Sequence, residues 1–267
     1  MKILLISGTH NRHLYFFHQL LGIDAEFSAI VMQRENQLPL VPPNLLARDQ
    51  KLFAHHFEAR FTVENARFGA PSPEETFAGI PQYFCEPHTL NTAEAAQFVA
   101  TQQPDLAVVF GPDLLKPPLF DALPATTINL HLGLSPWYRG AATLFWPFYF
   151  LEPNFAGATF HELTANPDAG NLLHQSVPAL SSGDGIHDVG AKTVEAATAD
   201  FVAIAKRIVA GEKFPLVPQR GQGKLFSRFD FRASHLRMIY EIFNDDIVDG
   251  FLAGDLSARE PKLHRAL

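Results

Sequence analysis

Residues 2–7 read KILLIS, an apolar run that ends at Gly8. A short run of this kind, without polar alternation, is typical of a strand buried on both faces of a parallel sheet. The segment LYFFHQLLG at 14–22 follows, with helical spacing of its apolar residues and a glycine stop. Ser28–Val31 is then expected to form a second strand. This strand-helix-strand order predicts a right-handed crossover and a doubly wound, mostly parallel α/β sheet.

Four later segments are predicted to extend this sheet. They are PDLAVVFG (104–111), TTINLHL (126–132), FAGATFHEL (155–163) and NLLHQ (171–175). A helix is expected after Asn91, because Glu94 three residues later resembles a capping box. A long helix with Asp184 near its cap and Gly211 at its end is expected after the last strand.

The alternation of helix and strand breaks down between Gln33 and Gly79. Within this stretch, Asn44–Asn65 is expected to form one or two helices laid over the domain. The predicted organisation is therefore a main domain over 1–212, with a helical insertion at about 33–79, and a small C-terminal appendage over 213–267.

The composition is ordinary for a water-soluble globular protein. Hydrophobic residues make up 47% of the 267 positions, and no apolar run approaches the ~20 residues of a spanning helix. A cytoplasmic protein without a membrane partner is expected. The net charge of −7 would repel polyanions, so no nucleic-acid partner is expected. Cys85 is the only cysteine, which excludes an internal disulfide and a zinc site of paired thiolates.

Polar residues at the end of the TTINLHL strand are the main candidates for chemistry. Asn129 and His131 are two residues apart, so on an extended strand their side chains share one face. An amide and an imidazole aimed at one point could stabilise the oxyanion of an acyl-transfer intermediate. Asp168 lies in the turn NPDAG (166–170) between two predicted strands. A strand parallel to the one bearing His131 would bring this carboxylate to the same sheet edge, where it could orient the imidazole.

This pattern resembles the folate-dependent formyltransferase family. The resemblance is carried by Asn-x-His at 129–131, the Leu-x-Pro turn followed by Tyr-Arg-Gly at 138–140, and Asp168 before Gly170. It is close over 108–175 and looser over the first strand and GKLFSRFDF at 223–231. It implies the Rossmann-like formyltransferase fold and transfer of a formyl group from N10-formyltetrahydrofolate to a primary amine, without a metal.

The resemblance also implies roles for individual positions. Asn129 and His131 match the family's oxyanion-binding and proton-handling pair, and Asp168 matches its essential aspartate. The loop expected to line the pterin pocket comprises Gly111, Pro112, Asp113, Leu114 and Leu115, and its other side would be closed by Thr164, Ala165 and Asn166.

Two departures from the family pattern bear on the acceptor. Gly133-Leu134-Ser135-Pro136 stands where the family usually has Ser-Leu-Leu-Pro, which removes or displaces the serine hydroxyl. The first loop lacks the glycine-rich phosphate-binding pattern of the ribonucleotide enzymes. An amino sugar carried on a nucleotide is therefore expected as the acceptor, with glycinamide ribonucleotide or another small amine as the alternative. The residues expected to bind it are Ser7, Thr9, His10, Trp137, Tyr138 and Arg139.

Three questions stay open at this stage. The insertion at 33–79 is interpreted either as a lid over the acceptor or as the face of a homodimer. A metal-dependent hydrolase is a competing hypothesis, with ligand pairs His10 and His13, His55 and His56, or His161 and Asp168, although none has the spacing of known zinc motifs. A non-catalytic nucleotide-binding module is the other, although Gly-x-Gly-x-x-Gly is missing after the first strand.

Overall fold

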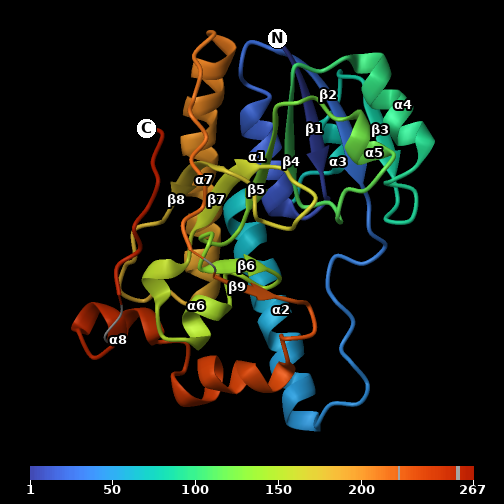
Figure 1. Cartoon of the computed structure of the whole chain (residues 1–267). Coiled ribbons are helices and arrows are strands. Elements are labelled where there is room, and N and C mark those ends of the chain that lie inside the picture. The colour runs from blue at the N-terminus through green and yellow to red at the C-terminus, as the bar shows by residue number, and fades with distance from the viewer. Residues whose placement is uncertain (222, 257–258) are drawn as a thin grey trace.

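A seven-stranded sheet lies at the centre of the protein, in the strand order β3-β2-β1-β4-β5-β7-β8 (Figure 1). The computed structural model describes residues 1–221, 223–256 and 259–267. The first five strands of this order are parallel, β7 is antiparallel to β5, and β8 is antiparallel to β7. Their bounds are β1 (Lys2–Ser7), β2 (Glu26–Met32), β3 (Gln82–Cys85), β4 (Leu106–Phe110), β5 (Thr127–His131), β7 (Ala158–Glu162) and β8 (Leu172–Ser176). The predicted doubly wound, mostly parallel fold is confirmed.

Helices cover both faces of this sheet, because its central strands are apolar on both sides. In β1, Ile3 and Leu5 face one core cluster with α1 and α7, whereas Leu4 and Ile6 face a second cluster with α4 and α5. The first cluster includes a stacked pair, Phe160 on β7 and Phe201 on α7, with ring centroids 4.6 Å apart. The helices are α1 (Asn11–Leu20), α4 (Ala93–Gln102), α5 (Leu119–Ala122) and α7 (Ile186–Val209).

The start of α4 differs from the prediction. Thr92 is the residue before the helix, and no side chain caps it. The Asn91 side chain instead accepts a hydrogen bond from the backbone N–H of Lys116 and donates one to the carbonyl of Leu114. The expected capping box is therefore wrong, because a tertiary contact with the loop after β4 uses the Asn91 amide.

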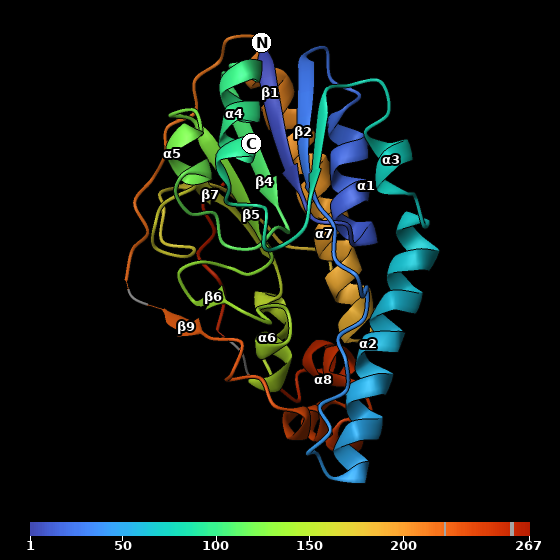
Figure 2. The same cartoon turned by 90° about the vertical axis from the view of Figure 1, so that its right-hand side faces the viewer.

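The insertion after β2 forms a long linker and a single long helix. In Figure 2 the linker 33–46 runs from the end of β2 to the far end of the molecule, and α2 (Ala47–Phe68) returns toward α1. The short helix α3 (Pro73–Thr76) follows, with a capping box between Ser72 and Glu75. Near its C-terminal end, α2 packs on α7, where Phe68 meets Ala191 and Val194.

The last part of the chain returns to the main sheet. Strand β9 (Lys224–Phe226) pairs with β6 (Tyr138–Gly140), and Phe226 stacks on Trp146 with centroids 4.5 Å apart. The tail then hydrogen-bonds to β8, where Gln175 N–H donates to His264 O and Ala266 N–H donates to His174 Nδ1. The remaining elements are α6 (Trp146–Tyr149), the 3-10 helices Pro153–Phe155 and Ala233–His235, the π-helix Met238–Ile242 and α8 (Ile247–Ala253).

Across the described ranges, none of the helices combines the length and hydropathy needed to span a bilayer.

Candidate active site

Strands β5 and β7 bring an amide and two imidazoles to one face of the sheet. Asn129 and His131 lie two residues apart on β5, and Asn129 stands directly opposite His161 on β7. Paired residues of neighbouring strands project to the same side, so these three side chains converge. Asn129 Nδ2 lies 3.2 Å from His161 Nε2. His161 is thus a member of this cluster that was considered from the sequence only as a metal ligand.

Asp168 reaches the cluster by a route that the sequence did not predict. Because β7 is antiparallel to β5, the loop 163–171 begins beside Thr127, where Leu163 N–H donates to the Thr127 carbonyl. The expected parallel strand is therefore wrong. The loop folds back over the sheet near β5 (Figure 1), and Asp168 adopts a left-handed backbone conformation with φ of 50°. Aspartate tolerates this region better than most residues.

The Asp168 carboxylate contacts both histidines. Its Oδ2 lies 3.4 Å from His131 Nδ1, and its Oδ1 lies 3.4 Å from His161 Nε2. Oδ2 also accepts a 2.7 Å hydrogen bond from the Gly140 N–H. On the other side of the His131 ring, Nε2 lies 2.9 Å from the Tyr138 carbonyl oxygen and donates to it. Each ring nitrogen of His131 therefore faces an oxygen acceptor.

Burial and charge act in opposite directions on this cluster. Burial lowers the pKa of His131, although the Asp168 carboxylate and the Tyr138 carbonyl oppose this shift. Burial acts to raise the pKa of Asp168, but His131, His161 and the Gly140 N–H outweigh it and lower that pKa well below its ordinary value. Asp168 is therefore ionised throughout the neutral range, so a negative charge always faces the two imidazoles.

The turn after β5 has no room for a side chain at its first glycine. A Cβ on Gly133 would lie 2.5 Å from His131 Nε2 and 2.7 Å from the Tyr138 carbonyl. The Thr159 hydroxyl connects the turn to β7 by donating to the Gly133 carbonyl and accepting from the Ser135 N–H. The Ser135 hydroxyl is buried without a hydrogen-bond partner among the described residues. Thr159 thus supplies the hydroxyl that holds this turn.

Two segments expected to line a pterin pocket lie near the same strands. Since β4 and β5 pair in parallel with Val109 opposite Asn129, Gly111 follows β4 at the level of His131. Gly111 has a φ of 89°, and a Cβ there would meet the His13 ring at 2.2 Å. Leu114 is half exposed, and the Asp113 carboxylate pairs with Arg34. In the opposite segment, 164–166, the Thr164 hydroxyl donates to the Asn166 carbonyl.

The residues expected to bind the acceptor are not brought to one place. Ser7 is fully buried, with its hydroxyl donating to the Gly8 carbonyl, and Thr9 borders an open groove with Arg34 and Gln37. His10, at the start of α1, stacks edge-on against His13.

Trp137 and Tyr138 pack into the core cluster beneath β6. The Trp137 ring meets Phe155 at 5.4 Å, and the Tyr138 hydroxyl donates to Glu152. Tyr138 is 4% exposed, so its ring offers no free face to a ligand. The Arg139 side chain is half-buried, and its Nε has no hydrogen-bond partner among the described residues.

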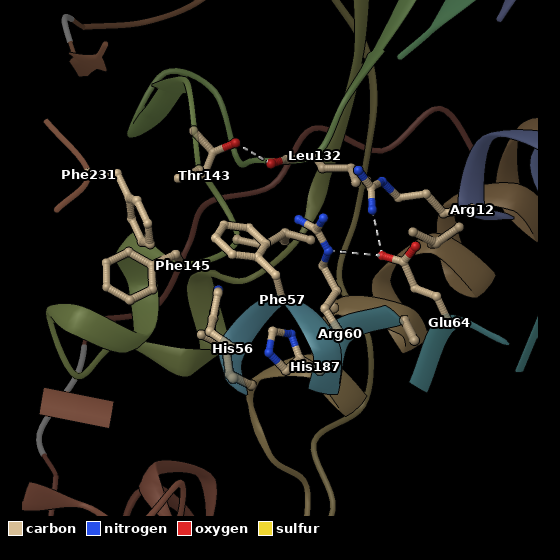
Figure 3. A pocket seen from close by; sticks show the side chains of 16 residues that line it. Arg12, His56, Phe57, Arg60, Glu64, Leu132, Thr143, Phe145, His187 and Phe231 are labelled. Atoms are coloured by element: carbon tan, nitrogen blue, oxygen red, sulfur yellow. Dashed lines mark hydrogen bonds and ion pairs between the residues drawn. The ribbon is translucent and has the colours of Figure 1, made fainter. Parts of the chain in front are cut away.

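A cavity of about 260 Å³ lies beside the cluster, between α2, α7 and the segment 142–145 (Figure 3). Leu132, the residue after His131, lines it, and the Thr143 hydroxyl bonds to the Leu132 carbonyl. Its polar lining comes from Arg12 on α1, Arg60 and Glu64 on α2, and two histidines. The amino-acid sequence did not indicate a functional role for these α2 residues. Arg60 and Glu64 are one helical turn apart, which is also the ordinary spacing of a surface ion pair.

Among the described residues, no group of three or more histidine, cysteine, aspartate or glutamate side chains has an arrangement suited to a metal ion. Of the three pairs considered as metal ligands, His161 and Asp168 are the pair found in the β5–β7 cluster.

The segment that carries this cluster matches a known protein family. Residues 54–204, more than half of the chain, match the family described as formyl transferase. This chain belongs to the formyl transferase family. The matched range contains Asn129, His131, His161 and Asp168, so the polar cluster lies within the family domain of this formyltransferase.

Solved structures of formyltransferases share the fold at low sequence identity. A phosphoribosylglycinamide formyltransferase from Anaplasma phagocytophilum is 16% identical, with a TM-score of 0.57 over 85% of this chain and 98% of its own. A 4-N formyltransferase from Francisella tularensis is 17% identical, with a TM-score of 0.56 over 86% and 77%. An N-formyltransferase from Helicobacter canadensis, in complex with folinic acid and dTDP-3-aminofucose, is 15% identical, with a TM-score of 0.53 over 90% and 80%.

Proposed function

We propose that this formyltransferase moves a formyl group from N10-formyltetrahydrofolate to a primary amine, with Asn129, His131 and Asp168 at the reacting centre. The observation that carries this proposal is the contact of one carboxylate with two imidazoles beside an amide, on strands β5 and β7. A negative charge, a proton carrier and a hydrogen-bond donor are the three components that attack of an amine on a formyl carbon requires.

The segments 111–115 and 164–166 are the proposed walls of the pterin site. Gly111 ends β4 with a positive φ, so the following residues turn away from the strand, and Leu114 leaves an apolar side chain half exposed there. A heterocycle is commonly bound by an apolar cover and a few backbone polar groups. The donor supplies the formyl carbon and takes up one proton at N10 when its carbon–nitrogen bond breaks.

In the first step, the neutral amine of the acceptor forms a bond to the formyl carbon, and the carbonyl electron pair moves to the oxygen. The second N–H of the Asn129 amide donates to this oxyanion, and the positive charge of the protonated His131 ring stabilises it. Removing one such donor typically costs ~3 kcal/mol of transition-state stabilisation. The Asp168–His131 pair takes the proton that the attacking nitrogen loses, and this proton passes to the departing N10 as the second bond breaks.

The ionised Asp168 favours the protonated form of His131 during this step. Protonation at Nδ1 places a cation 3.4 Å from Oδ2, while Nε2 keeps its hydrogen bond to the Tyr138 carbonyl. Burial lowers the pKa of His131 in the resting protein. The imidazole is therefore able to receive a proton and then release it.

His161 has the part of a positioning residue. Its Nδ1 donates to the Glu162 carbonyl at 2.8 Å, which fixes the ring, and Nε2 faces both Asn129 and Asp168. The Asn129 amide donates to this Nε2 when His161 is neutral. His161 thus orients the amide without contacting the formyl group.

The acceptor proposed is an amino sugar carried on a nucleotide. The Helicobacter protein named above was solved with dTDP-3-aminofucose, which belongs to this class. The first loop of this chain, residues 7–12, lacks the glycine-rich phosphate-binding pattern of ribonucleotide enzymes, which argues against a purine precursor. Glycinamide ribonucleotide is the second candidate, because the Anaplasma protein has this fold and that name.

The test measures tetrahydrofolate release from N10-formyltetrahydrofolate with a panel of amino-sugar nucleotides, glycinamide ribonucleotide and simple amines. Turnover with an amino-sugar nucleotide, and its loss in His131→Gln, is the expected result. Turnover with glycinamide ribonucleotide alone would contradict the proposed acceptor class and would support the proposed formyl transfer. Full activity of His131→Gln would contradict the assigned reacting centre.

A further inference from the structure

The cavity beside the active-site cluster contains more positive than negative charge. Arg12 and Arg60 extend into it from α1 and α2, and both reach toward the single carboxylate of Glu64 (Figure 3). Arg12 Nη1 lies 2.5 Å from Glu64 Oε1, whereas Arg60 Nε lies 3.8 Å from the same oxygen. Arg60 therefore has a long, incomplete contact with a carboxylate oxygen already occupied by Arg12.

The remaining titratable groups of the cavity do not balance this charge. His56 and His187 lie side by side at its floor, with ring centroids 4.5 Å apart, and both face the Tyr240 hydroxyl. Burial lowers the pKa of His187 to about 3, so it is neutral at physiological pH. Burial and the neighbouring Arg12 lower the pKa of Arg60 to about 10, at which it is still charged.

Among the described residues, the cavity also has a buried hydrogen-bond donor that lacks an acceptor. The Nε atom of Arg12 is buried and has no partner among the described residues, although a guanidinium carries five N–H donors in a fixed planar array. A partly buried cation pair with free donors is stabilised by a bound oxyanion, and paired arginines commonly bind phosphate or carboxylate groups.

The rest of the cavity is apolar and small. Its walls include Phe57, Phe145, Val194 and Phe231. A volume of about 260 Å³ falls just below the ~300–1,000 Å³ common for drug-sized ligands. This volume accommodates one ring and one charged group, so only that part of a nucleotide-linked amino sugar would occupy the cavity.

We infer that Arg12 and Arg60 bind an anionic substituent, a phosphate or carboxylate, of the amine acceptor. Leu132 connects this cavity to His131 along β5, so a molecule held by the arginines places its other end next to the active-site cluster. That the ligand is the acceptor rests on the proposed function. That the cavity binds an oxyanion rests on the two arginines alone.

Titration calorimetry with inorganic phosphate and with acetate, at constant ionic strength set by chloride, tests the anion site directly. Wild type is expected to bind at least one of the two, and the preferred one identifies the substituent. Arg60→Gln is expected to weaken this binding by about ten- to hundredfold. Glu64→Gln is expected to tighten it, because the competing carboxylate is removed. Arg48→Gln is the matched control, since Arg48 lies on the same helix but is exposed and pairs with Glu241.

Three results would overturn the inference: no binding of either anion by wild type, equal binding by Arg60→Gln and wild type, or weaker binding by Glu64→Gln. If another variant fails to fold, anion binding is measured with Arg60→Lys, which keeps the positive charge.

Turnover measurements separate this inference from the proposed function. Arg60→Gln is expected to raise the acceptor KM by about tenfold or more, with an unchanged donor KM. Anion binding without any formyl transfer would contradict the proposed function alone. Formyl transfer without anion binding would contradict only the inferred anion site at Arg12 and Arg60.

Discussion

Asp168 differs from an ordinary turn aspartate because each of its carboxylate oxygens faces a different imidazole. Its left-handed backbone conformation is of a kind that costs about 1–3 kcal/mol and occurs mainly at functional sites. The Gln219 side chain donates to the Asp168 carbonyl at 2.8 Å and so supports this conformation from the C-terminal part of the chain. The carboxylate is thus positioned by contacts from outside its own loop.

Asp168→Asn is expected to reduce kcat by about 10²–10⁴-fold, because the amide keeps the shape of the carboxylate but cannot take up a proton or stabilise an imidazolium. Tetrahydrofolate release measures this loss, and circular dichroism checks that the variant is folded. Asp121→Asn, an exposed position on α5 outside the proposed site, is the control. A kcat within threefold or so of wild type in Asp168→Asn would remove Asp168 from the mechanism.

Gly133→Ala is expected to lower the free energy of unfolding by about 1–3 kcal/mol and to reduce activity, since the new Cβ would meet His131 Nε2 and the Tyr138 carbonyl. Gly250→Ala in α8 is the matched control, because its Cβ would make only ordinary contacts with Leu256. That change should be neutral or stabilising by about 0.5–1 kcal/mol. Urea denaturation of both variants distinguishes these outcomes, and equal stability would show that the turn can shift.

Individual residues were predictable where spacing alone places them. Asn129 and His131 are two residues apart on one strand, and alternation puts them on one face. The place of His161 in the cluster could not be predicted in the same way. It depends on the register between β5 and β7, and therefore on the direction of β7, which the sequence of neither strand specifies. Arg60 and Glu64 form a pattern that most surface helices share, so only the packing of α2 against α7 reveals that they face a cavity.

At the level of elements, two ion pairs connect the N-terminal part of α2 to the C-terminal segment. Asp49, which is 5% exposed, accepts two 2.8 Å hydrogen bonds from the Arg237 guanidinium. Arg48 pairs with Glu241 one residue away on the helix, but its side chain is 61% exposed. The position of α2 therefore depends mainly on the buried pair.

Asp49→Asn is expected to destabilise the protein by about 1–3 kcal/mol, because it leaves a partly buried guanidinium without its charge partner. Arg48→Gln should cost less than about 1 kcal/mol, as exposed pairs usually do. Chemical denaturation of the two variants measures this difference. Comparable losses in both would show that burial does not distinguish these pairs.

Strand positions followed from the sequence more reliably than strand directions. The run at 2–7 and the LAVVF core of 104–111 are mainly apolar, 126–132 alternates apolar with polar residues, and each of the three contains the expected strand. The reversal at β7 was not predictable, because a strand buried on both faces has the same composition in either direction. Pairing of β9 with β6 joins segments more than 80 residues apart, and no local pattern indicates it.

At the scale of the whole molecule, buried histidines make stability depend on pH. The pKa is lowered below the ordinary value of 6.5 for His10, His13, His56, His131, His187, His235 and His264, with burial as the largest cause in each. Below pH 6.5 the unfolded chain therefore binds more protons than the folded one, and stability falls. Asp245, whose pKa burial raises to about 6, has the opposite effect between its ordinary value and pH 6.

The Tm is accordingly expected to be constant above about pH 7 and to fall between pH 6.5 and 5. Scanning calorimetry over this range measures the slope. His187→Gln should make the slope shallower, because glutamine binds no proton in the unfolded chain. A Tm that rises on acidification would show that the raised pKa of Asp245 dominates this linkage.

The linker and α2 together form one uninterrupted stretch, 33–68, and this stretch supplies Arg60, Glu64 and the Phe57 wall of the cavity. The groups proposed to react lie elsewhere, between positions 129 and 168. If the proposed function and acceptor site hold, a relative with a different helix in this interval is expected to bind a different amine and to keep the same groups for proton transfer. Exchanging residues 33–68 between two such proteins would test this expectation.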